Sequence, residues 1–249
     1  MALSRRAAVL GGLAALSCRS SPRVTPMASV RHRPLASLPT TSLPWLQLRD
    51  HFVATVGPGA GSGKPLGPLL VLADATFAPR SRFPLHPHRD MEILSVVLDG
   101  ELSHHGDGAN GAVVPARGAQ LISARSGMVH AEGNETDRPT RMLQLWFQPT
   151  TRGGAPAYHY RQLPDAPGSH LLAGDAEMPL RCDVRVHWLD VRGRWEQPLE
   201  PGRVGYAFAI SGTLSVEDTR LGTGDGAVVS GQGAVLAGEG AALWMDLPA

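Results

Sequence analysis

The sequence of 249 residues predicts an all-β fold made of two similar β-barrels in tandem. Its 29 glycines and 21 prolines form about a fifth of the chain and separate short apolar runs, which is typical of short strands joined by turns. An internal repeat is the second observation, because "VVLDGELSHH" from Val96 resembles "AFAISGTLSVED" from Ala207 when Gly100 is aligned on Gly212. This offset of 112 residues indicates two domains of one design.

The N-terminal segment differs from the rest of the chain, because its first 49 residues contain no Asp or Glu. "SRRAAVLGGLAALSC" (4–18) joins a twin arginine to an apolar run that is too short to span a bilayer, and it fits an export signal. The Arg- and Ser-rich composition down to Arg33 fits an organelle transit peptide equally well. A true start at Met27 would leave a cytoplasmic protein with an upstream extension. In each case we expect residues 1–42 to be a presequence or disordered extension, and Cys18 to lie outside the fold.

The first barrel is expected over residues 43–155. Its strands are predicted in "MEILSVVLDGELSHH" (91–105), in "GAVVPARGAQLISARSGMVHAE" (111–132) and in "RMLQLWFQP" (141–149). A loop rich in Pro, Gly and Arg then leads to a second barrel over residues 156–249. In that barrel "GDGAVVSGQGAVL" repeats the pattern of "NGAVVPARGAQLI".

Two pairs of polar side chains mark a candidate metal site in the first barrel. His86 and His88 are two residues apart in "FPLHPH", so in an extended segment their side chains point to one face. His130 and Glu132 form a second such pair in "MVHAE". Three imidazoles and a carboxylate that converge at a barrel mouth suit Fe, Mn, Ni, Cu or Zn. The alternative is a set of buried, hydrogen-bonded histidines.

The repeat makes the second barrel a useful comparison. At the same offset of 112 residues, Pro198 and Glu200 occupy the places of His86 and His88. We therefore expect the C-terminal barrel to lack metal ligands.

Composition excludes several other functions. A formal net charge of +1 gives no basic surface for direct nucleic acid contact or for an anionic membrane. Two cysteines cannot build a disulfide framework or a zinc–thiolate site. "GPGAGSGKPLG" (57–67) is not a phosphate-binding loop, because Pro58 and Pro65 stand where that motif needs Gly and Ser or Thr. We expect no membrane span and a monomer.

The sequence resembles the pirin family of bicupins. The family pattern is H-x-H-x-x-x-E with a glycine eight residues later, followed by S-G-x-x-H-x-E. The matching residues are His86, His88, Glu92 and Gly100, then Ser126, Gly127, His130 and Glu132. The resemblance implies two tandem cupin (jelly-roll β-barrel) domains. It also implies one divalent metal in the N-terminal cupin, Fe(II) being the first choice, held by His86, His88, His130 and Glu132. Glu92 is expected beside these ligands without binding the metal.

The family offers two functions. Some pirins are similar to quercetin 2,3-dioxygenases, which implies an O₂-dependent ring opening of a phenolic, flavonol-like enol, with Glu132 as both ligand and base. Phe83, Met128 and Trp146 are candidates for the pocket wall, or else plain barrel core. The alternative is a non-enzymatic, redox-sensing metal-binding regulator that docks a protein partner. A different cupin reaction on a small polar substrate is a third possibility.

Overall fold

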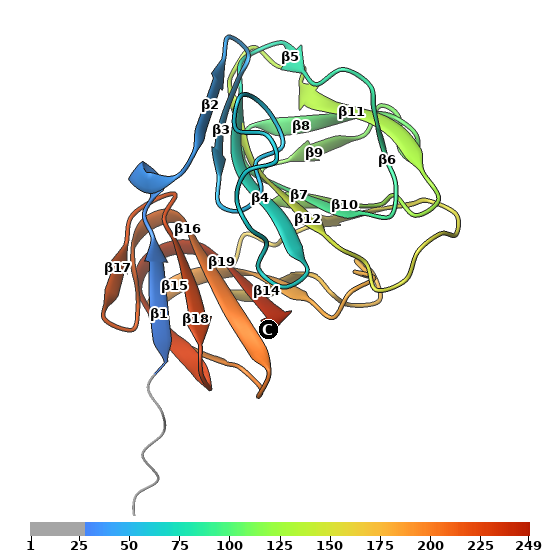
Figure 1. Cartoon of the computed structure of the whole chain (residues 1–249). Helices are drawn as coiled ribbons and strands as arrows, with labels where there is room; N and C mark the ends of the chain where they lie inside the picture. Colours follow the sequence, from blue (N-terminus) through green and yellow to red (C-terminus); the bar gives the residue numbers. More distant parts are fainter. Residues whose placement is uncertain (1–27) are drawn as a thin grey trace, which may run out of the picture.

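The computed structural model describes residues 28–249, which form two β-barrels packed against each other (Figure 1). Apart from one short 3₁₀ helix, η1 (Leu35–Ser37), all regular elements in this part of the chain are strands, which confirms the all-β prediction. Within residues 28–249 no helix is long and apolar enough to cross a membrane. The targeting segment, Cys18 and the alternative start at Met27 lie outside the described residues.

The N-terminal barrel consists of two sheets. The order of the seven-stranded sheet is β13-β10-β7-β12-β4-β3-β2, and that of the five-stranded sheet is β5-β11-β8-β9, with β6 also paired to β11. The strands are β2 (Thr40–Leu43), β3 (Leu46–Asp50), β4 (Leu69–Phe77), β5 (Ser81–Arg82), β6 (His86–His88), β7 (Glu92–Asp99), β8 (Glu101–Gly106), β9 (Val113–Pro115), β10 (Gly118–Ser123), β11 (Met128–Asn134), β12 (Thr140–Phe147) and β13 (Ala157–Gln162).

The C-terminal barrel is a single seven-stranded sheet that wraps around its own core. Its order is β1-β18-β16-β19-β15-β14, with β17 paired to β16. The strands are β1 (Ser29–Arg33), β14 (Gly168–Ala173), β15 (Arg185–Pro198), β16 (Arg203–Val216), β17 (Thr219–Leu221), β18 (Gly226–Ser230) and β19 (Gly233–Pro248). Three of these strands are 14 to 16 residues long, and each contributes to both faces of the curved sheet.

The two glycines that the repeat aligns, Gly100 and Gly212, both adopt a positive φ. Gly100 has a φ of 78° in the turn between β7 and β8, and Gly212 has a φ of 82° where β16 bends. A side chain at Gly212 would place its Cβ 2.1 Å from the backbone oxygen of Glu239, so only glycine fits there. The two aligned glycines therefore serve the same purpose in the two domains.

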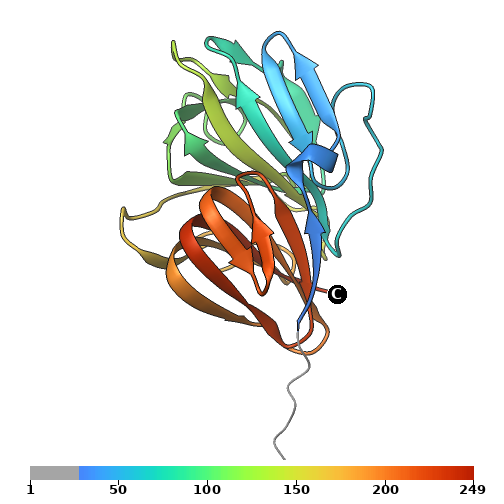
Figure 2. The ribbon, with the colours of Figure 1, turned by 90° about the vertical axis from the view of Figure 1, so that its left-hand side faces the viewer.

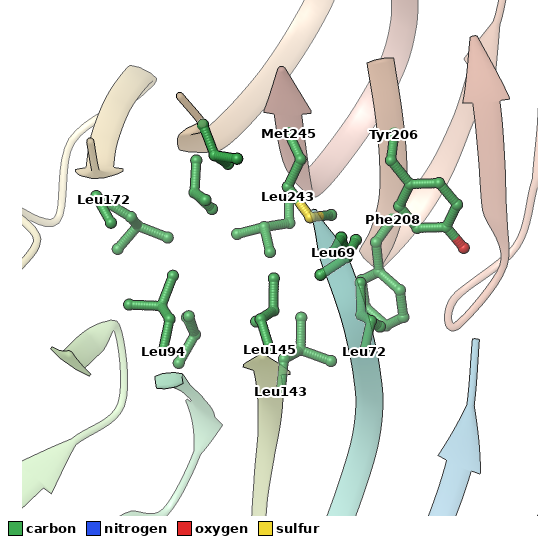
Figure 3. Close-up of a cluster of buried hydrophobic side chains, with 14 of the residues drawn as sticks. Leu69, Leu72, Leu94, Leu143, Leu145, Leu172, Tyr206, Phe208, Leu243 and Met245 are labelled. Atoms are coloured by element: carbon green, nitrogen blue, oxygen red, sulfur yellow. The ribbon is translucent and has the colours of Figure 1, made fainter. Parts of the chain in front are cut away.

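A large apolar core joins the two barrels. Strands β7, β10 and β12 direct one row of side chains toward the C-terminal sheet, and Figure 3 shows the two sets facing each other. The labelled residues are Leu69, Leu72, Leu94, Leu143 and Leu145 from the N-terminal barrel, and Leu172, Tyr206, Phe208, Leu243 and Met245 from the C-terminal barrel. Because all ten are buried, the two domains pack against each other through one continuous hydrophobic interface.

The structure corrects both domain boundaries. Strand β1 pairs antiparallel with β18 of the C-terminal barrel, and β2 pairs with β3, so residues 29–42 are not an extension outside the fold (Figure 2). Strand β13 pairs with β10, so the first domain continues beyond residue 155. Strand β1 could not be recognised from the sequence, because it is an edge strand and its residues "SVRHR" show no apolar alternation.

Side chains of β1 contact both the loop after β3 and the C-terminal sheet. The Arg33 guanidinium donates to the backbone oxygen of His51 and lies 5.1 Å from the ring centroid of Phe52. His32 contacts Asp225 with an N···O distance of 3.1 Å. The N-terminal segment therefore ties the C-terminal sheet to the loop that follows β3.

We predict that a chain starting at Ser42 is less stable than one starting at Ala28. The shorter chain loses the β1–β18 ladder, and a net value of about 1 kcal/mol per hydrogen bond gives a loss of at least about 2 kcal/mol. For a protein of this size, that corresponds to a fall in Tm of about 4–8 °C, measurable by calorimetry. Equal Tm values would show that β1 contributes nothing to the fold.

Candidate metal centre

Three histidine rings meet at the mouth of the N-terminal barrel. Strands β6 and β11 pair antiparallel, with His86 opposite His130 and His88 opposite Met128. The ring centroids are 4.9 Å apart for His86 and His88, 4.6 Å for His86 and His130, and 5.1 Å for His88 and His130. Pro87 suits the middle of β6, because this strand is only three residues long and pairs with β11 alone. The two sequence pairs thus bring their three imidazoles together.

These imidazoles are prepared to act as ligands. Nδ1 of His86 lies 2.8 Å from the backbone oxygen of Pro84, so Nδ1 carries the proton and Nε2 keeps its lone pair. His130 is fully buried, and neither of its nitrogens has a hydrogen-bond partner within residues 28–249. Burial, then His86 and His104, lower the pKa of His130 to about 3, and burial, then His130 and His86, lower the pKa of His88 to about 4. His88 and His130 are therefore neutral near pH 7, and neutral imidazoles with an available lone pair fit a divalent metal ion.

Glu132 lies deeper in the barrel and is held by three donors. Ser95 Oγ donates to its Oε1 at 2.8 Å, Gln120 Nε2 donates to the same oxygen, and Gln144 Nε2 donates to Oε2. Tyr158 fixes the Gln120 amide in turn, because its hydroxyl donates to Gln120 Oε1 at 3.0 Å. Burial raises the pKa of Tyr158 to about 12, so this hydroxyl remains a donor. The carboxylate is therefore oriented by the inner faces of β7, β10 and β12.

His104 completes the centre, and sequence reasoning missed it. The atoms that could bind a metal fall into two groups, His86–His88–His130 and His104–His130–Glu132, in each of which all atoms lie within 4.8 Å of one another. Glu132 is thus grouped with His130 and His104 and not with all three predicted histidines. The available signal was that His104 follows the apolar Leu102 by two residues, so that both side chains lie on one face of β8.

Glu92 does not lie beside the predicted ligands. It shares a face of β7 with Leu94 and Val96, both in the interdomain core, whereas Ser95 on the opposite face contacts Glu132. Its Oε1 accepts a hydrogen bond of 2.6 Å from Ser123 Oγ, and burial raises its pKa. The expectation for Glu92 is therefore wrong, because the strand's two-residue period turns it away from the centre.

The three proposed wall residues lie beside the histidines. The Trp146 ring centroid lies 5.0 Å from that of His88, and the Phe83 centroid lies 6.0 Å from that of His86. Both rings are half-buried, and Trp146 Nε1 has no partner among the described residues. Met128 lies opposite His88 in the β6–β11 pair and packs with Ile93 and Ile122 in a small apolar cluster that Trp146 also contacts. Met128 and His88 both line a hollow at this side of the barrel.

The fold and this histidine cluster define a bicupin whose ligand-type residues gather in the N-terminal barrel. The family profile described as pirin matches residues 33–147, and the profile described as quercetinase C-terminal cupin domain matches residues 173–247. A pirin-like protein of Caulobacter vibrioides is 33% identical over 195 residues, covering 74% of this chain and 83% of the relative. The chain therefore belongs to the pirin family.

Two further relatives are informative. A quercetin 2,3-dioxygenase of Escherichia coli is 28% identical over 169 residues, covering 65% of this chain and 73% of the relative. The fold of the bacterial pirin YhhW of Escherichia coli, solved in complex with nickel(II), superposes with a TM-score of 0.82 at 23% identity. That superposition covers 88% of this chain and 99% of YhhW, so the arrangement of both barrels is shared.

We predict that the metal-free chain loses stability on acidification partly through His130. The unfolded residue has its ordinary pKa of 6.5 and the folded residue a pKa of about 3, so between these values only the unfolded chain binds the proton. Stability falls as the pH falls through this window, and His130 accounts for about 1–2 kcal/mol between pH 7 and pH 5.

His130→Gln should lose less free energy of unfolding than wild type over this pH step, measured by urea denaturation. An equal loss in wild type and His130→Gln would show that His130 titrates normally.

Proposed function

We propose that this protein is a metal-dependent dioxygenase that uses O₂ to open the ring of quercetin or a similar flavonol-like enol. The observation that carries the proposal is a cluster of imidazoles beside an oriented carboxylate in the N-terminal barrel, in which His130 has no hydrogen-bond partner among the described residues. The name of the Escherichia coli relative, quercetin 2,3-dioxygenase, supports the reaction. Fe(II) is the proposed metal, and the nickel(II) complex of YhhW supports a divalent ion of this class.

His86, His88, His130 and Glu132 would hold the metal ion. The ion would lower the pKa of a bound enol hydroxyl and would activate the substrate for its reaction with O₂. Glu132 is the proposed acceptor of the hydroxyl proton. A carboxylate has about four lone-pair positions, and the three donors occupy three of them. The remaining position can meet either the ion or the substrate hydroxyl, so the two duties of Glu132 must be successive.

The aromatic walls would position the substrate. Phe83 and Trp146 flank the imidazoles on two sides and offer flat apolar faces to a phenolic ring. Trp146 Nε1 is buried without a partner and can donate to a substrate oxygen. Both rings also cover part of His86 and His88, and limited access of water suits a reaction with O₂.

We expect His86→Ala to weaken metal binding by more than tenfold, because loss of even an outer partner of a ligand costs about 10- to 100-fold. Isothermal titration of the metal-free chain with Mn(II) or Ni(II) measures this change. The rise in Tm on metal addition should shrink in parallel, since the ion binds only the folded state. His105→Ala is the control that keeps wild-type affinity. Unchanged affinity in His86→Ala would remove His86 from the site.

We expect Glu132→Gln to consume oxygen with quercetin about 10² to 10⁴ times more slowly than wild type, because it lacks the proton acceptor. An oxygen electrode measures the rate, and metal analysis shows whether the ion is retained. Glu92→Gln is the matched control. This second buried glutamate lies on the face of β7 opposite to Ser95, away from Glu132, so its change should leave the rate unchanged.

The proposal fails if wild type loaded with Fe(II), Mn(II), Ni(II) or Cu(II) consumes no oxygen with any flavonol. The metal-binding regulatory function would then replace the dioxygenase.

A further inference from the structure

A second set of ligand atoms lies on the inner side of the histidine cluster. It consists of His104, His130 and Glu132, whose ligand atoms lie within 4.8 Å of one another. All three residues are at most 1% exposed, whereas His86 and His88 of the outer set are only half-buried. The inner set shares His130 with the outer one and includes a residue, His104, that the family pattern above does not contain.

The orientation of His104 is that of a metal ligand. Its Nε2 lies 2.9 Å from the backbone oxygen of Asp107, and because a carbonyl only accepts, Nε2 must carry the proton. Nδ1 therefore keeps its lone pair, and this buried atom has no hydrogen-bond partner in the described part of the chain. Histidines that bind metals are typically held in this way, with the other ring nitrogen donating to a carbonyl or carboxylate.

The ring of His104 also faces the shared ligand. Its centroid lies 5.4 Å from that of His130, at an interplanar angle of 38°, and 5.3 Å from that of Tyr158 in an edge-to-face arrangement. His130 has two unpartnered nitrogens, so it can serve the outer set and the inner set in turn.

The chemistry of the inner set differs from that of the outer one. Two imidazoles and one carboxylate are the ligand combination of non-haem Fe(II) sites with open coordination positions. At the inner position Glu132 already lies within 4.8 Å of the other ligand atoms and would partly neutralise a dication. At the outer position the three imidazoles bring no negative charge, and Glu132 would have to reach the ion as a fourth ligand. In a site shielded from water, this difference favours the inner position.

We propose that His104, His130 and Glu132 form an inner metal-binding position, distinct from the outer position at His86, His88 and His130. A single ion can occupy either position because His130 belongs to both. The inner position requires that this centre bind a metal, but it does not require ring-opening activity. Its test therefore measures metal binding alone, in the full chain, and stands whether or not the protein consumes oxygen.

The decisive variant is the double change His86→Ala/His88→Ala, which leaves only the inner set. Titrated with Co(II) and followed by its visible absorption, this variant should still bind one ion per chain, at least about tenfold more weakly than wild type. Adding His104→Gln to the double variant should abolish this residual binding. Adding His105→Ala instead, a change at the neighbouring histidine outside both sets, should leave the binding intact.

Two results would overturn the proposal. One is a double variant that binds no Co(II) although its far-ultraviolet circular dichroism matches wild type. The other is residual binding that His104→Gln does not weaken. A Co(II) anomalous-scattering map of the double variant gives an independent reading, because the peak should lie within bonding distance of His104, His130 and Glu132. A peak elsewhere would exclude the inner position even if the triple variant does not fold.

Discussion

The seven-stranded sheet of the N-terminal barrel has a polar inner face that holds Glu132 and an apolar outer face that must be buried. The rest of the architecture depends on this constraint. Along β7, β10 and β12 every second residue points into the barrel, where Ser95, Gln120 and Gln144 hold Glu132. The residues between them, such as Leu94 and Leu145, form an apolar face that would contact water in a single barrel. The C-terminal barrel buries that face, so a domain whose described residues contain neither ligand group stabilises the sheet that positions the polar centre.

Much of this arrangement could be predicted from the sequence, because its causes are local. Two imidazoles at positions i and i+2 share a strand face whatever surrounds them, so His86 and His88 had to point together. The repeat was readable because a bend that needs a positive φ is restricted to glycine, and Gly100 and Gly212 both have one. That His130 would join the first pair followed from the family pattern. The pairing of β6 with β11 supplies the physical reason.

What could not be predicted depends on contacts between distant strands. Gln120 sits in an apolar run and reads as an ordinary strand residue until its partner, Glu132, is known. His104 is one of two adjacent histidines in a short strand, where a single apolar neighbour, Leu102, is a weak sign of which one faces inward, and its approach to Glu132 depends on the pairing of β8 with β11. Glu92 fits the family pattern, yet strand alternation sends it to the domain interface. Strand β1 is defined by the edge it pairs with, almost 200 residues later, and an edge strand needs no apolar alternation.

The centre is built at an energetic cost that the rest of the fold offsets. Buried polar atoms without partners cost about 1–3 kcal/mol each, and His104 Nδ1, both nitrogens of His130 and Trp146 Nε1 are of this kind among the described residues. Protonation offers no relief, because burial and neighbouring imidazoles lower the pKa of His130. A fold that only needed stability would fill this space with apolar side chains, as it does at the domain interface. The unpartnered nitrogens are therefore best explained as donors and acceptors for a ligand. A ligand that binds them removes the cost of leaving them unpartnered, and this gain adds to its binding free energy.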